Sequence, residues 1–153
     1  IATNGCIYDT MKTRVVIDTN VMLSALRSSK GASYALVSQL PLEHFQVALS
    51  VPLYTEYQDV LTRDEHMTGA SSKADILQFL RYVCGITSHH DIFFLWRPWL
   101  RDPKDDMVLE LAVASSSRYI VTHNLRDFAN IDTFGIEAIT PGRFLELLKG
   151  KTS

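Results

Sequence analysis

The chain has 153 residues, of which 46% are hydrophobic and 21% are charged, and its formal net charge is −2. These values are typical of one soluble globular domain with a sizeable core. The charge excludes a general polyanion-binding protein, so any contact with nucleic acid needs a local patch or metal ions.

The sequence carries no targeting or membrane signal. No apolar stretch approaches the ~20 residues that cross a bilayer, and residues 1–10 lack the basic region and apolar core of a signal peptide. Cys6 and Cys84 lack metal-ligand spacing and are expected to be reduced thiols. We therefore expect a cytoplasmic protein with no membrane contact.

The first predicted elements are a strand and a helix on either side of Asp18. The β-branched run "RVVID" at 14–18 predicts a short buried strand. The segment "TNVMLSALRS" predicts a helix directly after it, for which Thr19 or Asn20 is a suitable N-cap. Asp18 is thus expected at the carboxyl end of a strand, just before a helix.

The remaining pattern predicts alternating helices and strands. After the first helix we expect a helix at 33–40 ending at Pro41, a strand at 45–50, a helix at 51–63 with Pro52 in its first turn and a helix at 72–85 ending at Gly85. We then expect a short strand and loop at 90–100, a helix at 103–117, strands at 118–122 and 134–140, and a last helix at 141–150. This alternation predicts an α/β fold with a mainly parallel sheet and helices on both faces.

Polar side chains follow two of the predicted strands. Asp18 ends the first strand, and Thr122 and Asn124 stand at the end of the strand at 118–122, with Asp127 just beyond. In open α/β sheets, ligands bind outside the carboxyl ends of the strands. If these two strands are neighbours, the polar groups converge on one edge of the sheet.

Further acids precede or follow these strands in helices. Asp105 and Asp106 open the helix before the strand at 118–122, and Glu56 lies in the helix after the strand at 45–50. Clustered carboxylates repel one another unless a cation or a shared proton compensates them. Oxygen ligands of this kind suit Mg²⁺ or Mn²⁺, which activate water and stabilise charge on phosphoryl oxygens. The pattern therefore favours phosphodiester hydrolysis.

Three aspartates compete at the start of the helix at 103–117. Asp102 precedes Pro103 and resembles an N-cap, and Asp105 then occupies the third position of an arrangement like a capping box. Asp106 lies one residue further in, has no capping duty and has mostly apolar helical neighbours. We therefore predict that Asp106 serves the site and that the other two start the helix.

The pattern alone does not assign a site role to three other residues. Glu56 has Asp59 and Arg63 at helical spacing, which indicates a partly exposed face, so by pattern it is a surface glutamate. Asn124 and Asp127 follow a strand, where they could simply form a polar turn.

Four segments together resemble a known family. In this order the sequence contains "VVIDTNVMLSAL", "VPLYTEYQDVL", "DPKDDMVLELAVA" and "YIVTHNLRDF". They resemble PIN-domain proteins, and more narrowly the bacterial toxin components of toxin–antitoxin systems, the VapC-like ribonucleases. The resemblance covers about residues 12–148 as a single domain and leaves 1–11 and 149–153 as flexible termini. It implies a three-layer α/β/α fold with a central, mainly parallel sheet of about five strands.

The resemblance also assigns residues to a site. Asp18, Glu56 and Asp106 match the family's first three acids, which implies that they are catalytic and bind metal. The position where the family often has a fourth acid holds Asn124, and Asp127 could partly replace that acid, directly or through water. The supporting positions are Thr19, Asn20, Asp105 and Thr122.

The implied activity is that of a Mg²⁺- or Mn²⁺-dependent endoribonuclease that hydrolyses RNA with a metal-activated water. The resemblance further implies a cognate antitoxin that covers the acidic site, and it makes a homodimer an expected assembly. Because Asn124 departs from the family pattern, a catalytically impaired domain that binds RNA or protein is the alternative. An aspartyl-phosphate hydrolase is disfavoured by Asn20, and a nucleotide-binding module by the lack of a glycine-rich phosphate motif.

Overall fold

The computed structural model describes residues 12–67, 72–92 and 99–152, and in these residues five strands form one sheet. The strand order is β3-β2-β1-β4-β5, and every neighbouring pair is parallel. The strands are β1 (Thr13–Ile17), β2 (Phe45–Leu49), β3 (Ser88–His89), β4 (Tyr119–Val121) and β5 (Glu137–Ile139). This arrangement confirms the predicted mainly parallel sheet of about five strands.

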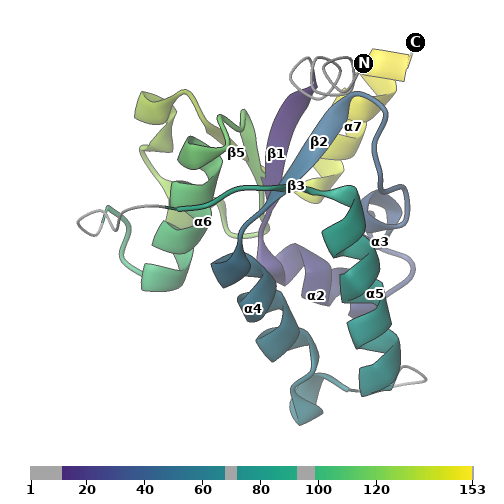
Figure 1. The fold of residues 1–153 in the computed structure, drawn as a ribbon. Coiled ribbons are helices and arrows are strands. Elements are labelled where there is room, and N and C mark those ends of the chain that lie inside the picture. Colours follow the sequence, from purple (N-terminus) through teal and green to yellow (C-terminus); the bar gives the residue numbers. More distant parts are fainter. Residues whose placement is uncertain (1–11, 68–71, 93–98, 153) are drawn as a thin grey trace, which may run out of the picture.

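Helices surround the sheet, with α6 and α7 on opposite faces of it (Figure 1). The α-helices of the described residues are α2 (Thr19–Arg27), α3 (Ala32–Val37), α4 (Val51–Leu61), α5 (Lys73–Ile86), α6 (Pro103–Ala114) and α7 (Pro141–Thr152). Short 3₁₀ helices lie at η1 (Asp64–His66), η2 (Leu125–Phe128) and η3 (Ile131–Phe134). The layers are those of the predicted α/β/α fold.

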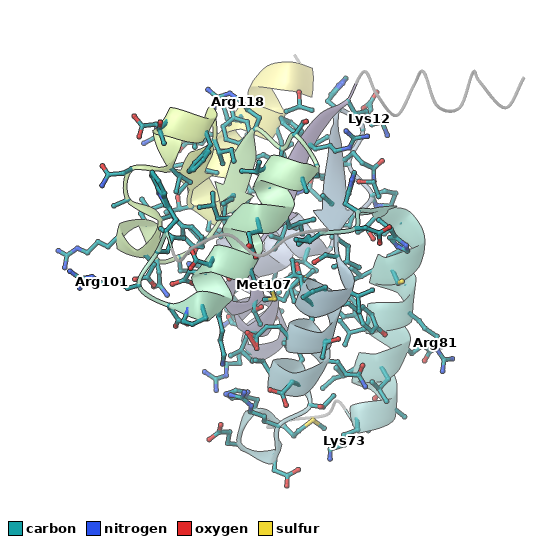
Figure 2. All side chains as sticks on the ribbon, turned by 60° about the vertical axis from the view of Figure 1, so that its left-hand side comes forward. Lys12, Lys73, Arg81, Arg101, Met107 and Arg118 are labelled. Carbon is teal, nitrogen blue, oxygen red and sulfur yellow. The ribbon has the colours of Figure 1, made fainter. Side chains whose placement is uncertain are left out.

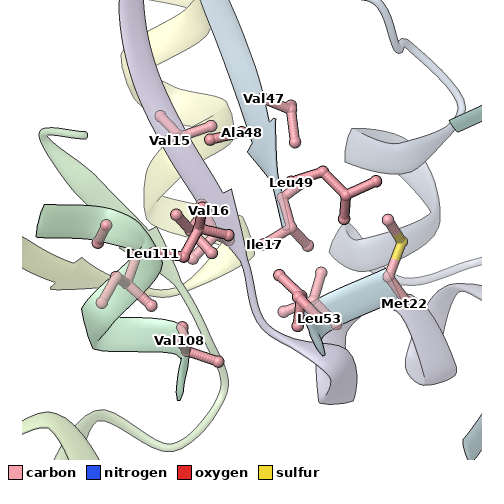
Figure 3. Packing of buried hydrophobic residues seen from close by; sticks show 14 of the residues in the cluster. Val15, Val16, Ile17, Met22, Val47, Ala48, Leu49, Leu53, Val108 and Leu111 are labelled. Atoms are coloured by element: carbon pink, nitrogen blue, oxygen red, sulfur yellow. The ribbon is translucent and has the colours of Figure 1, made fainter. Parts of the chain in front are cut away.

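The central strand β1 is covered on both faces. Val15, Val16 and Ile17 are all fully buried, although successive side chains of a strand point to opposite faces. Figure 3 shows Val108 and Leu111 of α6 beside this strand. Such burial is expected of a parallel sheet between two helical layers. It fixes the position of Asp18, the residue that follows the strand.

Helices α4 and α5 begin at defined caps. The Ser50 hydroxyl accepts a hydrogen bond of 3.2 Å from the Leu53 N–H at the start of α4. At α5, the Ser72 hydroxyl and the Asp75 carboxylate each accept a hydrogen bond from the other residue's backbone N–H, which is a capping box. Both caps are local, so the sequence alone is sufficient to specify them.

Several predicted boundaries differ from the structure: α6 ends at Ala114 rather than at 117, and Phe134, predicted in the last strand, belongs to η3. Helix α3 ends at Val37 with Ser38 as its C-cap, earlier than the restriction that Pro41 places on Leu40 requires. Helix α5 continues through Gly85 to Ile86, because this glycine does not adopt the left-handed conformation that ends helices. Strand β3 ends at His89, just before the segment 90–100 in which the sequence predicts a short strand; residues 90–92 are not in a strand, and residues 93–98 lie outside the described residues.

The ends of the chain complete the fold. Residues 149–152, expected in a flexible terminus, belong to helix α7, and residues 1–11 lie outside the described residues. No helix within the described residues has the length and apolar character that would let it cross a membrane.

Because all five strands run in the same direction, their carboxyl ends lie on one edge of the sheet, where Asp18 and Thr122 are found.

Candidate active site

Asp18 and Thr122 are neighbours at the carboxyl ends of β1 and β4. The two strands pair with Ile17 opposite Val121, so the next residue of each strand lies beside the other. The Asp18 backbone N–H donates to the Val121 carbonyl at 2.9 Å. The Thr122 hydroxyl donates to the Asp18 Oδ2 at 2.8 Å. The sheet register therefore positions the Asp18 carboxylate.

Asp18 also caps helix α2, which corrects the prediction that Thr19 or Asn20 would do so. Its Oδ1 accepts a hydrogen bond of 2.8 Å from the Thr19 N–H. The cap lies one residue earlier than expected because the backbone of Asp18 is still extended. Both carboxylate oxygens are thus held, and the side chain is fixed in orientation.

The Asp18 carboxyl has a raised pKa. Burial is the largest cause, since the residue is only 8% exposed. The hydrogen bonds from Thr122 and Thr19 oppose the shift, and the charges of Asp127 and Glu56 add to it. These last two contributions show that three acids, from three elements of the fold, act on one another at this edge.

The Thr122 hydroxyl is shared by several groups. It accepts a hydrogen bond of 3.0 Å from the Asn124 N–H and one of 3.4 Å from the Asn20 side-chain amide. The Asn20 Oδ1 in turn accepts from the His123 N–H at 3.3 Å. The fully buried Thr122 therefore ties the residues after β4 to Asp18 and to helix α2.

The three aspartates at the start of α6 have different partners. The Asp102 carboxylate caps the helix and accepts a hydrogen bond of 2.9 Å from the Lys104 N–H. The Asp106 Oδ1 accepts hydrogen bonds from two backbone N–H groups, of Leu100 at 2.8 Å and of Trp99 at 3.2 Å. Asp106 therefore holds the segment before the helix, a task that we did not predict for it.

Asp105 faces the other acids, contrary to the expectation that it completes a capping box. Within the described residues, the Asp102 N–H donates no hydrogen bond to the Asp105 carboxylate. Only the Asp102 side chain caps this helix. The pKa of Asp105 is raised to about 7, first by burial and then by the charges of Asp18 and Asp127. The charge of Asp18 thus acts on Asp105, whereas the Asp106 carboxylate is held by the backbone N–H groups of Trp99 and Leu100.

Glu56 is mostly buried, although its sequence neighbours indicated a partly exposed face. Its side chain is 12% exposed, and its charge helps to raise the pKa of Asp18. The Lys104 ammonium lies 3.9 Å from the Glu56 Oε1. Helix α4 therefore brings Glu56 to the same acidic edge, facing the start of α6.

Asn124 and Asp127 lie just after β4. Asn124 precedes helix η2, and its backbone N–H is bound to Thr122. Asp127 belongs to η2 and is exposed, and its charge raises the pKa of both Asp18 and Asp105. The same segment forms a polar turn and lies beside the candidate site. A turn-forming role and a site role for Asn124 and Asp127 therefore do not exclude one another.

Two further groups support the site without a signal in the sequence. The hydroxyl of the fully buried Tyr57 donates to the Ile17 carbonyl, and burial and then the Asp18 charge raise its pKa. The His123 Nε2 lies 2.9 Å from the hydroxyl of the buried Ser33. Both contacts join residues far apart in the chain, so only the tertiary structure reveals them.

The donor set has the chemistry of a site for a hard divalent cation. Asp18, Glu56, Asp105 and Asp127 offer only carboxylate oxygens, and their charges raise the pKa values of Asp18 and Asp105. Within residues 12–67, 72–92 and 99–152, no three His, Cys, Asp or Glu side chains are already placed to hold one metal ion together. The residues fit a cation by charge and donor type, and they would have to approach one another to bind it.

Two solved structures are similar in fold. VapBC2 from Rickettsia felis, bound to a DNA fragment from its promoter, has a TM-score of 0.58 and 14% identity over 84% of this chain and 98% of that chain. VapBC-1 from nontypeable Haemophilus influenzae has a TM-score of 0.56 and 14% identity over 85% of this chain and 99% of that chain. At this identity, the likeness shows a shared fold alone.

The sequence comparisons identify the family. Among curated proteins, none matches the sequence of this chain. The profile of the PIN domain matches residues 14–126, which include Asp18, Glu56 and Asp105 and end just before Asp127. The chain therefore belongs to the PIN-domain family.

Proposed function

We propose that this chain is a metal-dependent endoribonuclease and the toxin component of a toxin–antitoxin system. The observation that carries the proposal is the acidic edge around Asp18. There, the charges of Glu56 and Asp127 raise the pKa of Asp18. The pKa of Asp105 is raised to about 7 by burial and by the charges of Asp18 and Asp127. Excess negative charge of this kind costs stability unless the site binds cations. Membership in the PIN-domain family supports the same activity.

The residues that would hold Mg²⁺ or Mn²⁺ are Asp18, Glu56 and Asp105, with Asn124 and Asp127 as further candidates. Such a cation, when bound, lowers the pKa of water and stabilises charge on a phosphoryl oxygen. Asp106, which the sequence favoured as a ligand, is assigned here to positioning, because its carboxylate already holds two backbone N–H groups.

The protein groups around the site orient these acids. Thr122 and the Thr19 N–H each donate to one oxygen of the Asp18 carboxylate, which fixes its orientation. The Tyr57 hydroxyl holds the last carbonyl of β1 just before Asp18. Preorganisation of this kind keeps the reacting groups in place without cost during the reaction.

The proposed partners are RNA as the substrate, an antitoxin and a second copy of the chain. Two structures with a similar fold are VapBC assemblies, one of them bound to a promoter DNA fragment. An antitoxin that covers the acidic edge would bring a basic side chain to it, because the carboxylates there raise the pKa values of Asp18 and Asp105 by their charges.

The alternative function is an impaired PIN domain that binds RNA or protein without cleavage. The observation that favours it is Asn124, an amide at a position where a carboxylate would add a fourth strong ligand. An amide oxygen is a weaker ligand for Mg²⁺ than a carboxylate. Metal-dependent cleavage distinguishes the two functions.

The test is cleavage of a labelled structured RNA in Mn²⁺, Mg²⁺ or EDTA. We expect cleavage with either metal, none in EDTA and a loss of at least about 100-fold in Asp18→Asn, because loss of even an outer-shell partner costs 10–100-fold. The matched control is Asp75→Asn, which changes an exposed capping aspartate of α5. Equal cleavage by Asp18→Asn and the unmodified protein would contradict the proposal.

A second readout does not depend on turnover. Mn²⁺ should raise the melting temperature of the unmodified protein, since a ligand that binds only the folded state stabilises it. The rise should be lost in Asp18→Asn and kept in Asp75→Asn. RNA binding without cleavage under any condition would favour the binding module.

A further inference from the structure

Lys104 stands beside the acidic site in the described structure. Its ammonium lies 3.9 Å from the Glu56 Oε1, across the space between α6 and α4. The Glu56 side chain is 12% exposed, whereas that of Lys104 is 61% exposed. An ion pair this long with an exposed partner is weak, so most of the donor capacity of Lys104 is open to a ligand.

A groove extends from the site at this point. It has a volume of about 410 Å³ and is lined by Pro52, Thr55, Glu56, Asp59, Pro103, Lys104 and Met107. Because Glu56 belongs to both, the groove opens directly onto the acidic edge. Its prolines and methionine offer apolar surface, against which the sugars of a nucleic acid strand can pack.

The charges of the groove suit a phosphate at one position. Asp59 is already neutralised by Arg63, whose guanidinium lies 2.8 Å from it. The pKa of Arg63 is raised mainly by Asp59, and the charge of Glu56 adds to this shift. Among the described residues that line the groove, Lys104 is the only cation. Without Lys104, a phosphodiester in the groove would face only neutral and acidic side chains of the described residues.

From these contacts we infer that an RNA strand leaves the site along the groove between α4 and α6, and that Lys104 binds the phosphate next to the one that is cleaved. The inference rests on the proposed ribonuclease function and names the path of its substrate. In the free protein, the Lys104 ammonium is weakly paired with Glu56; in the complex, the phosphate becomes its partner.

The test measures binding of a fluorescein-labelled single-stranded RNA by anisotropy, in the Asp18→Asn background so that no cleavage occurs. Lys104→Ala should weaken binding by roughly five- to tenfold and reduce the slope of log affinity against log salt by about 0.7, the value for one phosphate contact on a single strand. Lys104→Arg should retain most of the binding, because it keeps the charge.

The matched control is Lys73→Ala. Lys73 has the same exposure of 61% and a similar partner, Asp64 at 3.8 Å, but it begins helix α5. Figure 2 shows it well away from Met107 of the groove. Its removal should leave the affinity and the salt slope unchanged, so a loss confined to Lys104→Ala cannot reflect total charge.

Two outcomes would overturn the inference. If Lys104→Ala and Lys73→Ala bind RNA equally well, and the unmodified protein still cleaves RNA with Mn²⁺, the groove is not the path although the ribonuclease function stands. If the folded unmodified protein neither binds nor cleaves RNA, both proposals fail together.

In the otherwise unmodified protein, Lys104→Ala should raise KM more than it lowers kcat, and melting temperatures verify that each variant is folded.

Discussion

Helices α5 and α6 begin with the same pattern, a cap followed three residues later by aspartate, but the two aspartates lie in different surroundings. At α5, Ser72 and Asp75 exchange hydrogen bonds and lie exposed to solvent. At α6, Asp102 caps the helix alone, and the pKa of Asp105 is raised by burial and by the charge of Asp18. One pattern therefore produces a capping box at one helix and, at the other, an aspartate whose pKa is raised by neighbouring acids.

The difference arises from what lies opposite each helix start. Helix α6 starts beside the carboxyl ends of the strands, where Asp18 lies, whereas α5 starts at the far end of α4 from the sheet (Figure 1). Local sequence decides that a helix begins, and tertiary structure decides whether its first turn meets a cavity, another acid or water. Variants of the two helices can test this explanation.

The largest expected effect comes from Asp105→Asn. We expect at least about a 100-fold loss of Mn²⁺-dependent cleavage, because the variant removes a carboxylate that would bind the cation. The same variant should raise the melting temperature in EDTA, since it removes repulsion from Asp18 and Asp127. Asp75→Asn at the equivalent position of α5 should cleave at the unmodified rate. Equal activity of the two variants would contradict the difference drawn between the helices.

Asp106→Ala should act mainly on stability. It removes the charged acceptor of two backbone hydrogen bonds, from Leu100 and Trp99, which is expected to cost about 1–3 kcal/mol in the free energy of unfolding. Urea unfolding measures that loss. Cleavage by the folded variant should fall less than about tenfold, the lower limit for an outer-shell partner. A larger loss of cleavage than in Asp105→Asn would restore Asp106 as the ligand that the sequence favoured.

The sequence predicts the elements of the fold better than the roles of the acids. The strand ending at Asp18 and the helix opened by Pro103 follow from local composition, and both are present in the structure. Adjacent side chains of a helix point about 100° apart around the helix axis. The rotation of α6 about its axis therefore decides whether Asp105 or Asp106 points toward the end of β1. Only packing fixes that angle, so the local sequence does not decide between the two aspartates.

Contacts across the chain were equally beyond reach of the sequence. The bond between Thr122 and Asp18 follows from the predicted order of the strands only once their register is known. The buried hydroxyl of Tyr57 occupies a position that helical periodicity marks simply as apolar. Glu56 has polar sequence neighbours, and yet its side chain is nearly enclosed because α6 covers that part of α4.

The raised pKa values give the metal-free protein a stability that falls as the pH rises. An aspartate in the unfolded chain loses its proton near the model value of 3.8, whereas folded Asp105 keeps it up to about 7. Between these values the folded state binds more protons than the unfolded state, so the free energy of unfolding decreases with increasing pH. Asp18, whose pKa is also raised, contributes with the same sign.

Urea unfolding in EDTA at about pH 5 and about pH 8 measures this dependence. The decrease should be smaller in Asp105→Asn, in which only Asp18 remains, and unchanged in Asp75→Asn. An identical decrease in Asp105→Asn would show that Asp105 titrates like an exposed aspartate and would remove the electrostatic difference between the two helix starts.

The smallest expected effects come from the caps themselves. Ser72→Ala and Asp102→Ala each remove the side chain that accepts a backbone N–H at the start of a helix, so each should cost about 1 kcal/mol in the free energy of unfolding. The two variants should differ in one respect. Asp102 also raises the pKa of Asp105 by its charge, so Asp102→Ala should lower that pKa, measured by NMR titration of the Asp105 carboxyl in EDTA, while Ser72→Ala leaves it unchanged. If both caps have equal effects on stability and only one alters the titration of Asp105, then the two helix starts share their local chemistry and differ through the acids that α6 meets.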